Sequence, residues 1–284
     1  MRTDWIRTTR QRLCQFCKKA GWCSVSADGR VAICMRVESD KPTRNGGWLH
    51  RLTDDDWRPP PRRTVRRPAP KPKLDCVPIH QRCVASMRPE SLGWLSNNLG
   101  ISTDVIERFE VGYHDDNNVF SMAMRRPNGS ICGIKYRPYH GGKFCETGSK
   151  SGIFFVPGSL VCDYVLIVEG CSDAMAIHDL GHQSVIGRDN CTGNVEQIVT
   201  LFRRLKPNQV VIVPDNDSHG AGQRGAEALR FILKQQQPVE LLSLPDCIND
   251  VRDCIQQKES ADWLRNRIGE LISIDQHRKD STNE

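Results

Sequence analysis

Two short apolar runs in the second half of the chain are each followed by an amphipathic stretch. The runs are Tyr164-Val-Leu-Ile-Val168 and Val210-Val-Ile-Val213. Such β-branched runs are typical of strands that are buried on both faces of a parallel sheet. Helical patterns follow at residues 173–180 and 224–235. This alternation of strand and helix predicts an α/β unit with a mostly parallel sheet.

Three carboxylates stand at the ends of these predicted strands. Glu169 directly follows the first, and Asp215 and Asp217 follow the second in the segment Pro-Asp-Asn-Asp. Ligands collect at the carboxyl ends of parallel strands, because those ends share one edge of the sheet. Carboxylates gathered there repel one another unless a cation lies between them. Because hard divalent cations take oxygen ligands, the sequence predicts a Mg²⁺ or Mn²⁺ centre.

The stretch before the first apolar run has a different pattern. Residues 89–99 and 103–109 have the pattern of short helices. Residues 119–125 and 130–137 alternate apolar and polar positions around a Pro-Asn-Gly turn, which is a hairpin signal. We therefore expect a small α+β subdomain over residues 75–160.

Cysteines dominate the first part of the chain. Cys14 and Cys17 form a Cys-x₂-Cys knuckle, and Cys23 and Cys34 follow on either side of a predicted hairpin that turns at an Asp-Gly pair. Four thiolates arranged in this way can close a tetrahedral structural zinc site. A segment this short has too little core to fold without such a metal. His50 is an alternative fourth ligand in place of Cys23.

Composition narrows the class of protein. The chain has 284 residues, 13 cysteines, a formal net charge of +6 and a hydrophobic fraction of 38%. A disulfide scaffold would be small and secreted, so we expect reduced cysteines. No run approaches the ~20 apolar residues of a membrane span, and the N-terminus lacks a secretory core. We therefore expect a cytoplasmic protein with no membrane partner, while the modest positive charge permits a polyanion.

The boundaries between these patterns predict five segments. Residues between the cysteine-rich and middle parts hold prolines and basic residues but no acid, which predicts an extended linker that acts as a spacer, a phosphate contact or both. In order, the segments are a zinc-binding β module (1–57), the basic linker (58–74), the α+β subdomain (75–160), the α/β domain (161–258), and a helix with a polar tail (259–284).

The acids and their surroundings resemble the Toprim domain, a Rossmann-like fold of primases, topoisomerases and some nucleases. Val-Glu169-Gly and the Asp215-Asn-Asp217 element match its signature, an apolar strand ending in Glu-Gly and a later strand ending in Asp-x-Asp. Asp173, the glycine-rich residues 217–226 and the acidic residues 244–253 are similar to the primase version. The resemblance implies that Glu169, Asp215 and Asp217 are catalytic and hold Mg²⁺ or Mn²⁺.

The rest of the chain resembles bacterial DnaG-type primase in the order of its elements. The knuckle is similar to the zinc-binding module at the front of bacterial and phage primases. The resemblance implies that Asp173, Asp250 and Asp253 assist the metal directly or through water. It also implies that basic side chains contact nucleotide or DNA phosphates, namely Arg137, Lys143 and Arg224.

The resemblance implies a primase of phage, plasmid or mobile-element type, in a bacterial or phage-infected cell. It would make RNA primers on single-stranded DNA from nucleoside triphosphates. The sequence contains no Gly-x₄-Gly-Lys-Ser/Thr motif, so we expect a separate helicase as partner. Two alternatives stay open, a Toprim nuclease that uses the same acids and a non-catalytic zinc- and DNA-binding accessory protein of replication.

Overall fold

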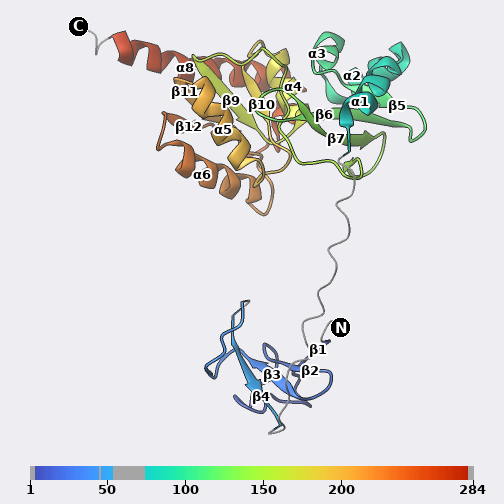
Figure 1. Cartoon of the computed structure of the whole chain (residues 1–284). Coiled ribbons are helices and arrows are strands. Elements are labelled where there is room, and N and C mark those ends of the chain that lie inside the picture. The colour runs from blue at the N-terminus through green and yellow to red at the C-terminus, as the bar shows by residue number, and fades with distance from the viewer. Residues whose placement is uncertain (1–3, 45, 54–73, 281–284) are drawn as a thin grey trace. The chain divides into compact units, whose positions relative to one another are not determined.

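The computed structural model describes residues 4–44, 46–53 and 74–280, and for residues 273–280 it describes the backbone only. The chain divides into two compact units, Met1–Ala69 and Pro70–Glu284 (Figure 1). Apart from residue 74, the predicted linker at 58–74 lies outside the described residues.

The N-terminal unit is a small antiparallel sheet around a sulfur-rich core. Its strand order is β1-β2-β3-β4, with bounds Trp5–Arg7, Ser24–Ser26, Val31–Cys34 and Trp48–Arg51. The predicted hairpin is confirmed, because β2 pairs with β3 and the turn between them includes Gly29 at φ 72°. The cluster of buried apolar side chains consists of Cys14, Cys23 and Cys34. So small a core contributes little hydrophobic stabilisation.

The second unit begins with the predicted α+β part. Three helices precede a four-stranded antiparallel sheet in the order β5-β6-β7-β8. Helix α2 has the predicted bounds, because Pro89 occupies its first turn and Gly100 ends it in the left-handed conformation. The bounds are α1 Cys76–Ala85, α2 Pro89–Leu99, α3 Thr103–Arg108, β5 Gly112–His114, β6 Val119–Arg125, β7 Ile131–Pro138 and β8 Phe144–Cys145.

A parallel sheet in the order β10-β9-β11-β12 follows, and all its pairings are parallel. The predicted α/β class is thus confirmed. The helix predicted within residues 259–284 is present as α8. The bounds are β9 Tyr164–Val168, α4 Cys171–Asp179, β10 Val185–Gly187, α5 Val195–Leu205, β11 Gln209–Ile212, α6 Ala221–Leu233, β12 Val239–Leu241, α7 Val251–Ile255 and α8 Lys258–Asp280.

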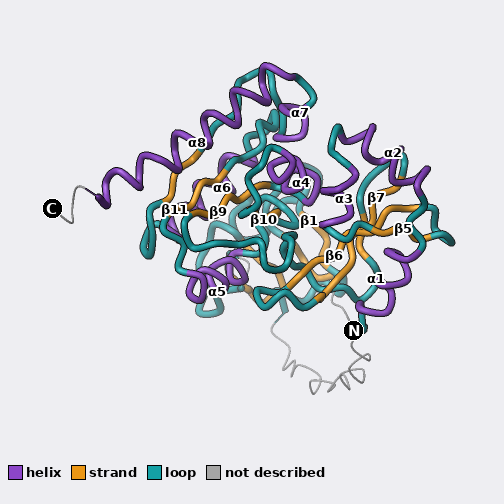
Figure 2. Tube along the Cα trace, turned by 90° about the horizontal axis from the view of Figure 1, so that it is seen from above, coloured by secondary structure: helices purple, strands orange, loops and turns teal. Residues whose placement is uncertain are grey.

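Helices cover both faces of this sheet. Successive residues of β9 point to opposite faces, so Leu166 packs with α4 and α8 while Val165 and Ile167 pack with α5 and α6. Figure 2 shows α8 and α5 on opposite sides of β9 and β11. The two-sided cover explains why the strands are continuously apolar. None of the described helices has the length and apolarity needed to cross a membrane.

Residues 152–155 form only single bridges. Arg125 at the end of β6 pairs with Ile153, and Phe154 pairs with Gly187 at the end of β10. Both bridges are antiparallel. They connect β6 of the antiparallel sheet to β10, the edge strand of the parallel sheet that neighbours β9.

Candidate active site

The parallel strands bring Glu169 and Asp215 to one edge of the sheet. Val168 pairs with Gly187, and the Arg188 N–H continues the ladder by donating to the Val168 carbonyl at 2.9 Å. Glu169 and Arg188 therefore follow neighbouring strand ends. The Val213 N–H donates to the Ile167 carbonyl, which carries the β11 ladder toward Asp215.

Close packing at the start of α6 helps to fix these acids. A Cβ atom added to Gly222 would lie 2.5 Å from the Asp215 carbonyl oxygen and 2.6 Å from Glu169 Oε1. Only glycine allows the helix backbone to approach both residues so closely. Part of the glycine-rich segment after Asp217 therefore has a packing role at this edge.

The acids are strained electrostatically. Burial raises the pKa of Asp215 to about 8, and Asp173, Glu169 and Asp250 add repulsion. Burial likewise raises the pKa of Glu169, as does repulsion from Asp217 and Asp173. The pKa of Asp173 is also raised by burial, and next by Asp250. Each of these carboxyls would ionise more readily beside a cation.

Two oxygens in this group are buried without a hydrogen-bond donor, Asp215 Oδ1 and Asp173 Oδ1. Buried polar atoms are normally satisfied, and an ion is one of the partners that can satisfy them. An all-oxygen set of buried, mutually repelling carboxylates fits a hard divalent cation such as Mg²⁺ or Mn²⁺. The residues present therefore fit the metal that the sequence predicted.

Asp217 has a different environment from Asp215. Its Oδ1 accepts from the N–H groups of His219 and Ala221, and its Oδ2 accepts from Gly222 N–H at 2.6 Å. These backbone donors lower the pKa of Asp217. In this structure both carboxylate oxygens thus cap the turn that leads into α6, whereas the sequence predicted a metal ligand.

Asn216, between the two aspartates, was not singled out by the sequence. Its Nδ2 lies 3.2, 3.1 and 2.9 Å from the carbonyl oxygens of Leu244, Pro245 and Ile248. The Asn216 N–H also donates to the Asn249 carbonyl. Because one side chain holds this whole segment, it fixes where Asp250 lies relative to β11.

Asp250 begins helix α7 and accepts from the Asp253 N–H at 2.7 Å. Its Oδ2 also pairs with the Arg252 guanidinium at 2.9 Å. Asp250 contributes to the raised pKa of both Asp173 and Asp215, so the acidic segment does reach the strand-end acids. Asp253 pairs weakly with Arg252, at 3.7 Å.

Two of the predicted phosphate-binding cations face this acid group. Burial lowers the pKa of Arg137, as does the charge of Arg252, while Asp173 and Asp250 oppose the shift. The side chain of Lys143 is exposed as a whole, yet desolvation near its ammonium lowers its pKa, and Asp173 opposes this. Both cations therefore lie within electrostatic reach of Asp173. Arg224, the third, lies on α6 and instead donates to the His219 carbonyl in the turn before that helix.

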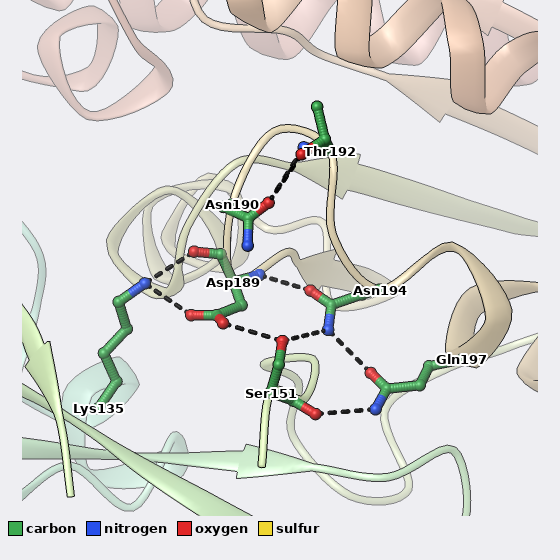
Figure 3. A network of polar contacts seen from close by, with 7 residues as sticks. All are labelled: Lys135, Ser151, Asp189, Asn190, Thr192, Asn194 and Gln197. Atoms are coloured by element: carbon green, nitrogen blue, oxygen red, sulfur yellow. Dashed lines mark hydrogen bonds and ion pairs between the residues drawn. The ribbon is translucent and has the colours of Figure 1, made fainter. Parts of the chain in front are cut away.

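A polar network that the sequence did not predict joins β7 to the loop after β10 (Figure 3). Lys135 Nζ lies 2.6 Å from Asp189 Oδ1 and 2.7 Å from the Asp189 carbonyl oxygen. Ser151 Oγ donates to Asp189 Oδ2, and Asn194 accepts from the Asp189 N–H. Gln197 donates to the Ser151 carbonyl. Because the Lys135–Asp189 pair is largely buried, the network locks the two sheets together beside the acids.

The cysteine cluster of the N-terminal unit is the second candidate site. The sulfurs of Cys14, Cys17, Cys23 and Cys34 all lie within 4.8 Å of one another, and among the described residues they form the one such group of three or more potential ligands. His50 is outside it, because its Nε2 contacts the Val37 carbonyl at 3.0 Å and its ring stacks on Phe16. The geometry thus favours the four-cysteine set over the alternative with His50.

The chain is similar to known proteins both in its acidic segment and in its fold. A family model described as Toprim-like matches residues 166–255. Residues 166–255 form a Toprim-like domain. No curated protein matches the chain in a sequence search. Among solved structures, the chain is similar to a DnaG primase catalytic domain bound to single-stranded DNA, with a TM-score of 0.54 and 17% identity, over 72% of this chain and 80% of that one.

Two further structures have the same fold as the region around the Toprim-like domain. The E. coli primase catalytic core matches with a TM-score of 0.51 and 17% identity, over 66% of this chain and 77% of that one. The zinc-binding and RNA polymerase domains of the Aquifex aeolicus primase match with a TM-score of 0.52 and 15% identity, over 68% of this chain and 59% of that one. At such identities the likeness establishes a DnaG-like catalytic-core fold, and the Toprim-like domain lies within it.

Proposed function

We propose that this protein is a DNA primase that makes short RNA primers on single-stranded DNA from nucleoside triphosphates. One observation carries the proposal. Glu169, Asp173 and Asp215 gather at the edge of the parallel sheet, two of them with unsatisfied buried oxygens, and Arg137 and Lys143 lie within reach of the same group. Such a combination suits polyphosphate substrates held beside a divalent cation.

Glu169 and Asp215, with Asp173 and Asp250 beside them, are the residues that would hold Mg²⁺ or Mn²⁺. Asp217 would join them on leaving the α6 amides that it now caps. A bound divalent ion supplies neutralisation of the charge on the transferring phosphate and alignment of the attacking hydroxyl. Lys135 and Asp189 keep β7 and the Toprim-like domain together, so that the cations on β7 and in the following loop keep their distance from the acids.

Arg137 and Lys143 would bind the phosphates of the nucleotide or the template. Both are partly desolvated, which strengthens their interaction with a phosphate once it enters. Arg137 also donates to Asn98 on α2. That contact is long, 3.4 Å, so a phosphate oxygen would replace it at little cost.

The four cysteines would bind one structural Zn²⁺. The module would then engage template bases or the initiating nucleotide, and the chain would work with a separate replicative helicase inside a bacterial or phage-infected cell. Support for DNA as a partner comes from a structure of the same fold that is bound to single-stranded DNA.

One assay tests the proposal directly. The purified full-length chain is incubated with single-stranded templates, labelled ribonucleotides and Mg²⁺ or Mn²⁺, and the products are sized on a gel. We expect short RNA products that need both template and metal. Cleavage of DNA without RNA synthesis would mean that the acids belong to a nuclease. If the protein binds the template but catalyses neither reaction, it is a non-catalytic accessory protein.

A further inference from the structure

A small cavity lies beside the acid group but away from Arg137 and Lys143. Its volume is about 200 Å³, below the range of roughly 300–1,000 Å³ typical of drug-sized ligands. It is lined by the loop after β10 and by one side each of α5 and α6, from Arg188 and Thr192 to Arg224 and Leu229. Two arginines and no carboxylate are among its lining residues.

Arg188 is the unusual member of this lining. Its side chain is almost fully buried, with 2% of the residue surface exposed. Its Nε and Nη2 both contact the Gly193 carbonyl, at 3.2 and 2.9 Å. Among the described residues no carboxylate oxygen lies within 4.0 Å of it, although Glu169 attracts it from further away. The buried guanidinium therefore has one carbonyl as its hydrogen-bond acceptor and no anion in direct contact, so a phosphate that reached it would be bound strongly.

The second cation, Arg224, is exposed and reaches back to the His219 carbonyl with Nη1 at 2.7 Å. The N–H groups of Ala221 and Gly222 are already taken by Asp217, so the helix start offers no free donors of its own at these positions. Charged donors at this cavity are therefore the two guanidinium groups. Guanidinium groups suit a phosphate, because their hydrogen bonds to its oxygens are assisted by charge.

The cavity is next to the acids. Arg188 follows β10 just as Glu169 follows the neighbouring β9, and α6 touches both Glu169 and Asp215 at Gly222. Arg137 and Lys143 approach the same acids near Asp173, on the α4 side. The acid group therefore has cations on two sides, and a substrate chain of phosphates would meet one set on each side.

We propose that Arg188 and Arg224 form a phosphate-binding subsite that takes a phosphate group of the substrate next to the acid centre. This deepens the proposed function, on which the choice of substrate rests. The phosphate has two possible sources with the same chemistry, the polyphosphate of a nucleoside triphosphate and the backbone of the DNA strand. Inorganic pyrophosphate is the simplest probe of the subsite.

Calorimetric titration of the full-length chain with pyrophosphate, without added divalent cation, tests the subsite. Arg224→Gln should weaken binding at least about tenfold, the loss expected for one charge-assisted contact. Arg188→Lys should weaken it too, because lysine keeps the charge but loses the contacts to the Gly193 carbonyl that hold the guanidinium in place. Arg230→Gln is the matched control, since Arg230 lies on the same helix, pairs with Glu227 at 3.6 Å and carries the same charge. Melting temperatures show whether each variant is folded.

A second arm identifies the source of the phosphate. The same variants are titrated with a nucleoside triphosphate and with a single-stranded oligonucleotide that lacks terminal phosphates. If the variants bind only the triphosphate more weakly than the wild type, the subsite holds the polyphosphate. If they bind only the oligonucleotide more weakly, the subsite holds the DNA backbone. If Arg224→Gln matches Arg230→Gln for all three ligands, the proposal is overturned, and Arg188 only offsets the charge of Glu169.

The outcome is independent of whether the chain makes primers. Pyrophosphate binding without primer synthesis in the wild type would reject the primase proposal and keep the subsite. Primer synthesis with unchanged binding in Arg224→Gln would keep the primase proposal and reject the subsite.

Discussion

The cysteine cluster and the acid group are both sets of like groups that suit a cation, yet they are built in opposite ways. The four sulfurs come from residues 14–34, a single knuckle and hairpin, and already lie within 4.8 Å of one another. The acids come from the ends of β9 and β11 and from the start of α4 and α7. Among the described residues, no three of their ligand atoms approach one another as closely as the sulfurs do.

The difference shows what each site contributes to its unit. In the N-terminal unit the cluster is the core, so a metal bound there and the fold would depend on one another. In the second unit a large apolar core holds the sheet whether or not the acids bind a metal. The acid group is therefore free to be electrostatically unfavourable, which is a common property of functional sites.

The largest expected effect is on the acid group. Asp215→Asn or Glu169→Gln should reduce primer synthesis by orders of magnitude, because metal positioning and charge neutralisation supply most of the rate in phosphoryl transfer. Melting temperature and DNA binding should stay close to wild type. Glu240→Gln removes an exposed charge from β12 of the same sheet and is the control. Near-wild-type primer yield in Asp215→Asn would mean that the metal centre lies elsewhere.

Replacing one residue of the cysteine cluster should instead unfold the N-terminal unit. Cys23→Ser should lower zinc to well under one equivalent per chain and unfold the N-terminal unit, because a structural site needs all four ligands. His50→Ala should keep the zinc, since His50 contacts Val37 and Phe16. Exposed Cys162 provides the control Cys162→Ser. The zinc content of each purified variant tests this prediction. If His50→Ala loses zinc and Cys23→Ser keeps it, the four-cysteine set is wrong.

The pH dependence of stability should separate the two units further. The pKa of Asp215 is about 8 in the folded chain, against about 3.9 for an unfolded aspartate. Between these values the folded chain holds a proton that the unfolded chain has released. Stability of the metal-free protein should therefore fall as pH rises from about 4 to about 8, by less than about 1.4 kcal/mol per pH unit.

The Asp215→Asn variant cannot bind this proton, so its stability should not change with pH for this reason. The variant should match or exceed the wild-type melting temperature near pH 8 and lose that advantage toward pH 4. Added Mg²⁺ should stabilise the wild type more at high pH, since the ligands must be deprotonated. Melting curves at several pH values, with and without Mg²⁺, measure both effects. Parallel curves for the two proteins would show that Asp215 ionises normally.

The smallest effect concerns how the acidic segment is held. Asn216→Ala should lower the free energy of unfolding by about 1–3 kcal/mol, because three carbonyl oxygens lose their donor. Asn249→Ala is the control, since in the described part of the chain its side chain makes no hydrogen bond. Denaturant titration compares the two variants. Equal stability would mean that other contacts hold the segment beside the acids.

Much of the second unit follows from local patterns. The strands β9 and β11 are recognisable because burial on both faces requires continuous apolar residues. Helix α5 was missed, although Val195, Ile198 and Phe202 have helical spacing that could have revealed it. Helix α1 carries Pro78 in its first turn, which disguises its start. Strand β10 has only three residues, too few for a pattern, and so Arg188 was missed with it.

The sequence by itself determined which cysteines come together, to within one alternative, and which acids follow the strands, because short spacings and strand ends are local properties. Only the tertiary structure decided which of those acids meet. It turned Asp217 onto the α6 amides, anchored Asp250 through Asn216, and set Arg188 beside Glu169. Each of these outcomes depends on which strands are neighbours in the sheet. Strand order is set by the packing of helices on both faces, which a local pattern does not contain.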